Sequence, residues 1–154
     1  MPTITPGYLY SFLALLAVSG LLVASFMAYA NTLRSSSETR LLKSLIDEIA
    51  SKCTGLVTLT ALGAPHARAS VEMPTSLGDN QYWIRLVNDS DQAWVGGGLG
   101  DIVNGYGDLR TYLPKDVYAT GIFVGGYGAA DLECHLDVKL VLLSICSANQ
   151  GELT

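Results

Sequence analysis

The sequence predicts an α+β protein, in which a mainly antiparallel β head packs on the C-terminal half of a long N-terminal helix. Three observations lead to this prediction. An uncharged run opens the chain, an amphipathic helical repeat continues it without interruption, and a glycine-rich remainder contains short β-like segments. We therefore expect a stem over residues 1–54 and a head domain over residues 55–154.

The uncharged run extends from Tyr8 to Ala30, and the first charged residue of the chain is Arg34. About twenty apolar residues, each rising about 1.5 Å, suffice for a helix to cross the hydrocarbon core of a bilayer. Three interpretations of the run stay open. It could be a secretory signal cleaved after the A-x-A sequence that ends at Ala30, a single membrane anchor, or a helix that packs against copies of itself.

Small residues recur on one side of this run. They lie three or four positions apart and so share a helical face. They are Ala17, Gly20, Ala24 and Ala28. Small side chains at this spacing allow two apolar helices to approach closely, which makes these residues candidates for helix self-association. Alanine and glycine are also simply frequent in membrane-spanning helices, and this explanation stays open.

The helical pattern continues past the uncharged run and becomes amphipathic. Apolar residues recur at helical spacing, with charged residues between them. They are Leu42, Leu45, Ile46, Ile49 and Cys53. We expect a helix from Tyr8 to Lys52 or beyond, with Gly55 as a possible interruption and Gly63-Ala64-Pro65 as the stop. Its later part should be half covered by the head.

The head reads as short strands separated by glycine-rich loops and bulges. Strands are expected at residues 82–87, 92–95, 117–125, 129–135 and 138–146. Leu136-Asp137 is expected to connect the last two strands, and the glycines at 96–98 are expected in a loop or bulge. Residues 138–145 are almost continuously apolar, which is typical of a strand covered on both faces.

Two tryptophans flank the predicted turn at residues 88–91. If Val87 pairs with Gln92, Trp83 lies opposite Gly96 and Trp94 lies opposite Arg85, so that both indoles share one face. We expect that face to be buried against the stem or a neighbouring subunit, because clustered tryptophans are costly to leave in water.

Charge and cysteine usage limit the functional classes. The net charge is −5, and residues 72–154 carry eleven acidic and four basic side chains. Such an acidic head repels phosphate backbones, so nucleic acid is not an expected partner. No C-x-x-C pair is present, and His66 and His135 stand at no metal-ligand spacing. We expect neither a metal site nor a cofactor.

Other features bear on the compartment of the head. Three cysteines are compatible with one disulfide in an exported domain, drawn from Cys53, Cys134 and Cys146. Asn88 begins an N-x-S sequon and is a possible glycosylation site. Basic residues follow the apolar run, and the positive-inside rule would instead place the head in the cytoplasm. They are Arg34, Arg40 and Lys43. This conflict stays open.

No catalytic motif is present. Gly96 to Asp101 superficially resembles a nucleotide-binding glycine loop but lacks the G-x-G-x-x-G spacing and a following helix. Asp101 and Asp108 are expected to be solvated turn residues. We expect the protein not to be an enzyme, although a membrane-tethered hydrolase is a third hypothesis.

The chain resembles the archaeal type IV pilin-like superfamily, which includes adhesion pilins and archaellins. The resemblance rests on the apolar helix YLYSFLALLAVSGLLVASFMAYA, its amphipathic continuation LLKSLIDEIASKC and the glycine-rich β head. It implies a structural subunit of an extracellular filament, assembled with copies of itself and held in the membrane beforehand. In that family a basic leader is clipped before the apolar helix. Here Gly7 marks the only plausible junction, and no lysine or arginine precedes it.

An alternative is a single-span, membrane-anchored envelope protein whose exported β head binds a partner. This alternative needs the same apolar helix but no contact between copies. The residues that distinguish it from a filament subunit are those of the small-residue face.

Overall fold

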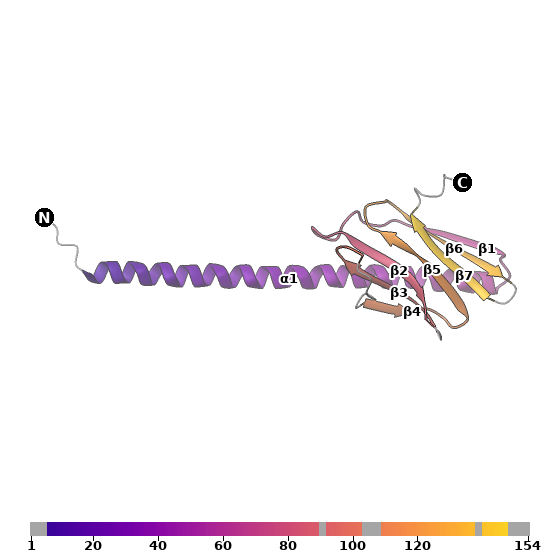
Figure 1. Ribbon diagram of the computed structural model, residues 1–154, viewed down its shortest axis with the longest axis horizontal. Coiled ribbons are helices and arrows are strands. Elements are labelled where there is room, and N and C mark those ends of the chain that lie inside the picture. The colour runs from indigo at the N-terminus through magenta and orange to yellow at the C-terminus, as the bar shows by residue number, and fades with distance from the viewer. Residues whose placement is uncertain (1–5, 90–91, 103–108, 138–139, 148–154) are drawn as a thin grey trace. The chain divides into compact units, whose positions relative to one another are not determined.

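The computed structural model describes residues 6–89, 92–102, 109–137 and 140–147 (Figure 1). It contains the helix α1 (Pro6–Ala61) and seven strands: β1 (His66–Val71), β2 (Tyr82–Asn88), β3 (Ala93–Leu99), β4 (Leu109–Tyr112), β5 (Val117–Val124), β6 (Ala130–Asp137) and β7 (Leu140–Ser147). The predicted α+β class is confirmed. Contacts divide the chain into two compact units, residues 1–37 and residues 38–154.

Helix α1 ends where the sequence predicts a stop. Gly63 has a φ of 107°, a conformation that residues with a β-carbon rarely adopt. The amide of Gly63 donates to the carbonyl of Thr60 at 3.1 Å, and that of Ala64 donates to the carbonyl of Leu59 at 3.3 Å. This pair of bonds is a Schellman motif, which satisfies the last carbonyls of the helix before Pro65. Gly55 does not interrupt the helix.

The seven strands form one sheet in the order β1-β6-β7-β5-β2-β3-β4. Every neighbouring pair is antiparallel except β5 and β7, which run parallel. β1 and β4 are the edge strands. Neither β1 nor the short strand β4 is among the strands that the sequence analysis predicts.

The core of the second unit lies between one face of this sheet and the Glu38–Ala61 part of α1 (Figure 1). The helix contributes the apolar side of its amphipathic repeat, as predicted. Its buried members are Leu42, Ile46, Ile49, Ala50, Cys53 and Leu56. The sheet contributes every second residue of its strands, including Ile84, Val95, Phe123 and Leu132. This alternation follows from the period of two along a β-strand.

Glycines 96–98 lie inside strand β3, so the prediction of a loop or bulge is wrong. They are needed because bulky groups occupy both faces. A β-carbon on Gly97 would lie 2.7 Å from the carbonyl oxygen of Trp83 and 3.2 Å from Cδ1 of Ile46. A β-carbon on Gly98 would lie 2.9 Å from the indole of Trp83, and one on Gly96 would clash with the indole of Trp94.

The β2–β3 hairpin has a different register from the predicted one. Asn88 pairs with Ala93 and Trp83 with Gly98, so each partner is shifted by two residues. The amide of Asp89, a residue expected in the turn, donates to the carbonyl of Gln92 at 3.2 Å, so Asp89 still bonds across the hairpin. A shift of two keeps side chains on the same face, and therefore both tryptophans do share a face.

Two further predictions about strands are corrected. Leu136 and Asp137 belong to β6 and pair with Val141 and Leu140, so they do not form the connection to β7. In β7, Leu143 and Ile145 are buried while Leu142 and Ser144 are partly exposed. One face of β7 is therefore buried in the core beneath the helix, and the other face is only partly covered.

We predict that Gly97→Ala destabilises the head by about 1–3 kcal/mol, because the new methyl group must displace backbone of β2 or the side chain of Ile46. Chemical unfolding in nonionic detergent, followed by near-ultraviolet circular dichroism, measures this change. Gly55→Ala is the control: it sits in the helix with nothing within 4 Å of its new methyl group and should stabilise by about 0.5–1 kcal/mol. Equal stability of Gly97→Ala and the wild type would contradict the proposed packing of β3.

Candidate functional site

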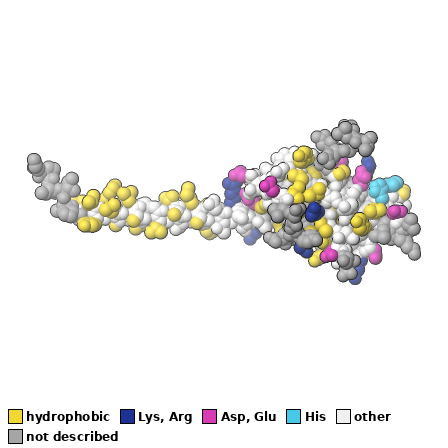
Figure 2. Space-filling view, in the orientation of Figure 1, with side chains coloured by type: hydrophobic (Ala, Val, Ile, Leu, Met, Phe, Trp, Pro, Cys, Tyr) yellow, Lys and Arg dark blue, Asp and Glu magenta, His cyan; other side chains and the backbone are white. Residues whose placement is uncertain are grey.

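The N-terminal part of α1 is an exposed apolar surface. Within the described residues, α1 is the one helix long and apolar enough to cross a membrane, and its most apolar segment is not buried. Figure 2 shows hydrophobic side chains along this part of the helix. Tyr8, Leu21 and Phe26 are 77%, 69% and 72% exposed. Water is a poor solvent for such a surface, so the helix needs lipid or protein around it.

The four small residues predicted for self-association all lie in this exposed segment. A β-carbon on Gly20 would meet no other atom within 4 Å, so the space beside this residue is open. The helical geometry brings Ala17, Gly20, Ala24 and Ala28 onto one face, as the spacing requires. Their role in helix association stays a prediction.

Three hydroxyl side chains in the same segment donate hydrogen bonds within the helix. The hydroxyl of Ser11 donates to the carbonyl of Gly7, that of Ser25 to Leu21, and that of Thr32 to Ala28, at distances of 3.1, 2.8 and 3.0 Å. Hydroxyls bonded to the preceding turn in this way need no water. These three side chains therefore impose little penalty in an apolar environment.

A buried carboxylate marks the start of the helix part that belongs to the head. Glu38 is 6% exposed, and its Oε2 accepts a hydrogen bond from Nδ2 of Asn80 at 2.8 Å. The same side chain fills the space where a β-carbon of Gly78 would stand. Glu38 thus fastens α1 to the segment between β1 and β2. Gly78 in this segment has a φ of 64°, a conformation that glycine adopts readily.

A second polar contact fastens α1 to the edge strand β4. Nζ of Lys43 donates to Oδ1 of Asp47 at 2.8 Å and to Oγ1 of Thr111 at 2.7 Å, while the Thr111 hydroxyl donates to Asp47 at 2.6 Å. Hydrogen bonds from Lys43 and then from Thr111 lower the pKa of Asp47. The charges in this part of the helix therefore hold a short strand in place.

The cysteines are free thiols in the structure. Cys53 and Cys134 lie in the core, and Oγ1 of Thr60 is 3.3 Å from Sγ of Cys134. Burial raises the pKa of Cys53 to about 12, and the nearby thiol of Cys134 adds to the shift. Cys146 is partly exposed on β7. Disulfide formation among the three cysteines stays a prediction.

Glycosylation of Asn88 also stays a prediction. Asn88 is exposed at the end of β2, and Ser90 of the same sequon lies outside the described residues.

The two tryptophans are buried on the sheet face turned away from α1. Trp83 and Trp94 are 5% and 3% exposed, whereas their strand neighbours Ile84 and Val95 belong to the core beneath the helix. Each indole lies over a glycine of β3, and the guanidinium of Arg110 stacks 4.6 Å from the centre of the Trp94 ring. The Glu38–Ala61 part of α1 packs on the opposite face of the sheet. Burial against a neighbouring subunit stays a prediction.

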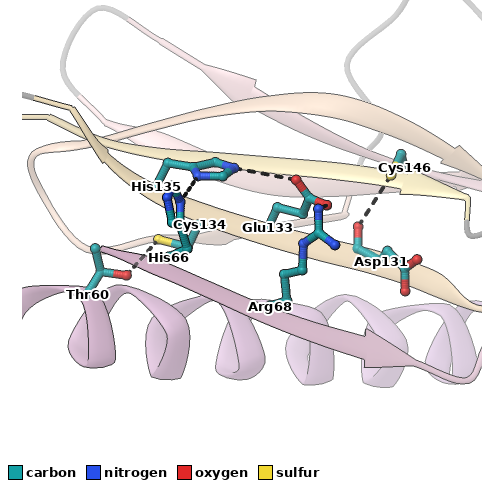
Figure 3. A network of polar contacts seen from close by, with 8 residues as sticks. All are labelled: Thr60, His66, Arg68, Asp131, Glu133, Cys134, His135 and Cys146. Atoms are coloured by element: carbon teal, nitrogen blue, oxygen red, sulfur yellow. Dashed lines mark hydrogen bonds and ion pairs between the residues drawn. The ribbon is translucent and has the colours of Figure 1, made fainter. Parts of the chain in front are cut away.

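A row of polar side chains crosses β1 and β6 on the outer face of the sheet (Figure 3). His66 pairs with His135 and Arg68 pairs with Glu133 in the antiparallel register. The Nδ1 atoms of the two histidines are 2.5 Å apart, and the Arg68 guanidinium donates to Oε1 of Glu133 at 2.6 Å. Nε2 of His135 lies 3.4 Å from Oε2 of Glu133.

Reasoning from the sequence missed this cluster, because the two histidines are 69 residues apart. A signal was present in the alternation of polar residues along both strands, His66-x-Arg68 and Glu133-x-His135. Only the pairing of β1 with β6 brings the two patterns together. Asp101 is exposed, and Asp108 lies outside the described residues, so no pairing of these two carboxylates can be described.

Searches against protein-family models, curated proteins and solved structures found no match. The architecture itself is pilin-like: a long apolar N-terminal helix is followed by a mainly antiparallel sheet that packs on the helix. The apolar helix is compatible with membrane insertion or secretion.

We predict that the Lys43–Asp47–Thr111 contact weakens in acid. A folded-state pKa below the ordinary value means that the carboxylate stabilises the fold above that value, about 3.9, and that this contribution is lost as the pH falls below it. Asp47→Asn should therefore be less stable than the wild type near pH 6, and the difference should shrink towards about pH 3. Glu48→Gln, at an exposed neighbour, controls for the change in helix charge. A difference that is constant with pH would contradict the assigned contact.

Proposed function

We propose that this protein is the structural subunit of an extracellular, type IV pilus-like filament that assembles through its N-terminal apolar helix. The observation that carries the proposal is the division of α1 into two environments. Residues 42–56 bury their apolar side beneath the sheet, whereas the large apolar side chains of residues 8–33 are all exposed. The same helix therefore supplies part of the core of the head and, in its N-terminal segment, an uncovered apolar surface.

Energetics favour a covered location for that surface. Removing an apolar helix of about twenty residues from water hides on the order of 1,500 Å², which corresponds to tens of kcal/mol at about 25 cal/mol per Å². Lipid provides most of this gain before assembly, so transfer into a bundle of copies adds much less. Close approach at Ala17, Gly20, Ala24 and Ala28 is the source of the additional stabilisation that we propose.

In this proposal the partners are copies of the same chain and, before assembly, the membrane; nucleic acid is not a partner. The head would line the outside of the filament at the cell surface. We also propose that the protein is not an enzyme and uses no cofactor. In support, the glycine run that resembles a nucleotide-binding loop has a packing explanation, because Ile46 packs against one face of the run and the indoles of Trp83 and Trp94 pack against the other.

A membrane-anchored envelope protein is the second candidate. Bulky apolar side chains surround the exposed segment, and lipid would cover them as well as protein would. Tyr10, Leu15, Leu22 and Met27 are among these side chains. In this case the head, rather than the helix, would carry the interaction with a partner.

Gly20→Leu distinguishes the two functions. The larger side chain should keep two helix backbones apart at a cost of about 1–3 kcal/mol per contact, and every subunit repeats this cost. We expect filament yield from the cell surface, counted by negative-stain microscopy, to fall sharply, and Ala24→Leu should act in the same way. The head should stay folded by circular dichroism.

Ser19→Leu is the matched control, because it adds similar bulk at an exposed position on the opposite side of the helix. Its filament yield should approach that of the wild type. A wild-type level of filaments from Gly20→Leu and Ala24→Leu would support the anchor instead. So would a wild-type chain that remains in the membrane fraction and forms no filaments.

A further inference from the structure

The spacing of His66 and His135 in the sequence predicts no metal site, but the fold brings them together, and we propose that they form a binding site for a borderline divalent transition metal, zinc or copper, on the outer face of the sheet. The two residues face each other across β1 and β6, and their Nδ1 atoms approach to 2.5 Å. The ring centroids are 4.7 Å apart at an angle of 78°. Neutral imidazole nitrogens are preferred ligands of zinc and copper.

Glu133 sets the position of the proton on one of these ligands, His135. An ionised carboxylate can only accept hydrogen bonds, so its contact with Nε2 of His135 favours the proton on Nε2 and leaves the lone pair on Nδ1. Nδ1 is the atom that faces His66. A metal-bound histidine whose other ring nitrogen donates to a carboxylate is the usual arrangement in metal sites. Arg68 in turn holds Glu133 at 2.6 Å and neutralises its charge.

The two rings are close to the separation that a metal ion requires. Without metal, one Nδ1 proton can bridge the pair. With metal, His66 takes its Nε2–H tautomer, so that both Nδ1 atoms offer lone pairs. Bonds of about 2.0–2.1 Å in a tetrahedral arrangement place two nitrogens roughly 3.3 Å apart. The nitrogens must therefore separate by under about 1 Å, which small rotations of two surface side chains provide.

The location suits a ligand that reaches the site from solvent. β1 is an edge strand, and the His135 side chain is 42% exposed. The protein supplies two of the coordination positions, and water fills the others. Sites of this composition bind more weakly than structural zinc sites with four protein ligands. The inference does not depend on filament formation, because both ligands belong to one chain.

Isothermal titration calorimetry of the full chain in nonionic detergent, with Zn²⁺ as the probe, tests the site. A Cys146→Ser background excludes the partly exposed thiol as a ligand. We expect one Zn²⁺ per chain with a dissociation constant of about 100 µM or lower. His66→Ala and His135→Ala should each weaken binding at least about tenfold, since each removes one of two protein ligands.

Glu133→Gln tests the positioning role. It should weaken binding by about tenfold and reduce the Nε2–H tautomer of His135 in nitrogen-15 nuclear magnetic resonance spectra. Asp131→Asn is the matched control, because it removes a carboxylate two residues away on the same strand and face; its affinity should match that of the background protein.

Magnetic resonance of the background protein gives a second readout that needs no histidine variant. These are the two histidines of the chain, so both imidazole signals should shift during the Zn²⁺ titration. The proposal is overturned by absence of binding at about 1 mM Zn²⁺. It is equally overturned by binding that survives loss of either histidine, by equal loss in Asp131→Asn, or by imidazole signals that do not move.

Discussion

The packing of one side of α1 against the sheet is the interaction on which the rest of the molecule depends. Leu42, Ile46, Ile49 and Leu56 fill the inner face of a single sheet, which without them would expose its apolar side chains to water. Polar contacts at Glu38 and Lys43 fasten the same helix to the loop before β2 and to β4. The same continuous helix contains the uncovered apolar segment, so every copy of the folded head has this segment attached to it.

The glycine run in β3 allows side chains to pack closely on both faces of the sheet. Side chains press on this strand from both faces, with Ile46 beneath Gly97 and the indoles of Trp83 and Trp94 over Gly98 and Gly96. A strand without β-carbons allows both layers to approach closely. The outer face carries a different chemistry at the β1 edge, where paired histidines and a carboxylate converge. Core, indole layer and histidine pair thus occupy distinct places on one sheet.

Local signals in the sequence sufficed for the helix and several strands. The helix end at Gly63-Ala64-Pro65 could be predicted because it depends on the backbone conformation of these residues themselves. Features that depend on contacts between distant residues could not be predicted. Glycines 96–98 were placed outside a strand because glycine is unfavourable there, and only the distant Trp83 and Ile46 explain them. The hairpin register differs by two residues from the predicted one, and the histidine pair depends on which strands become neighbours. The small-residue face at Gly20 could be predicted from the sequence. Its contact partner could not, because that partner belongs to another molecule.

Electron cryomicroscopy of filaments purified from the surface of cells that make this protein tests the central claim most directly. We expect a helical reconstruction in which residues 8–30 of each subunit pack against the same residues of its neighbours, with the sheets outside that bundle. Small residues at positions 17, 20, 24 and 28 should lie at the closest helix contacts. Filaments that lack the chain, or a chain recovered only as a monomer in the membrane fraction, would contradict the claim.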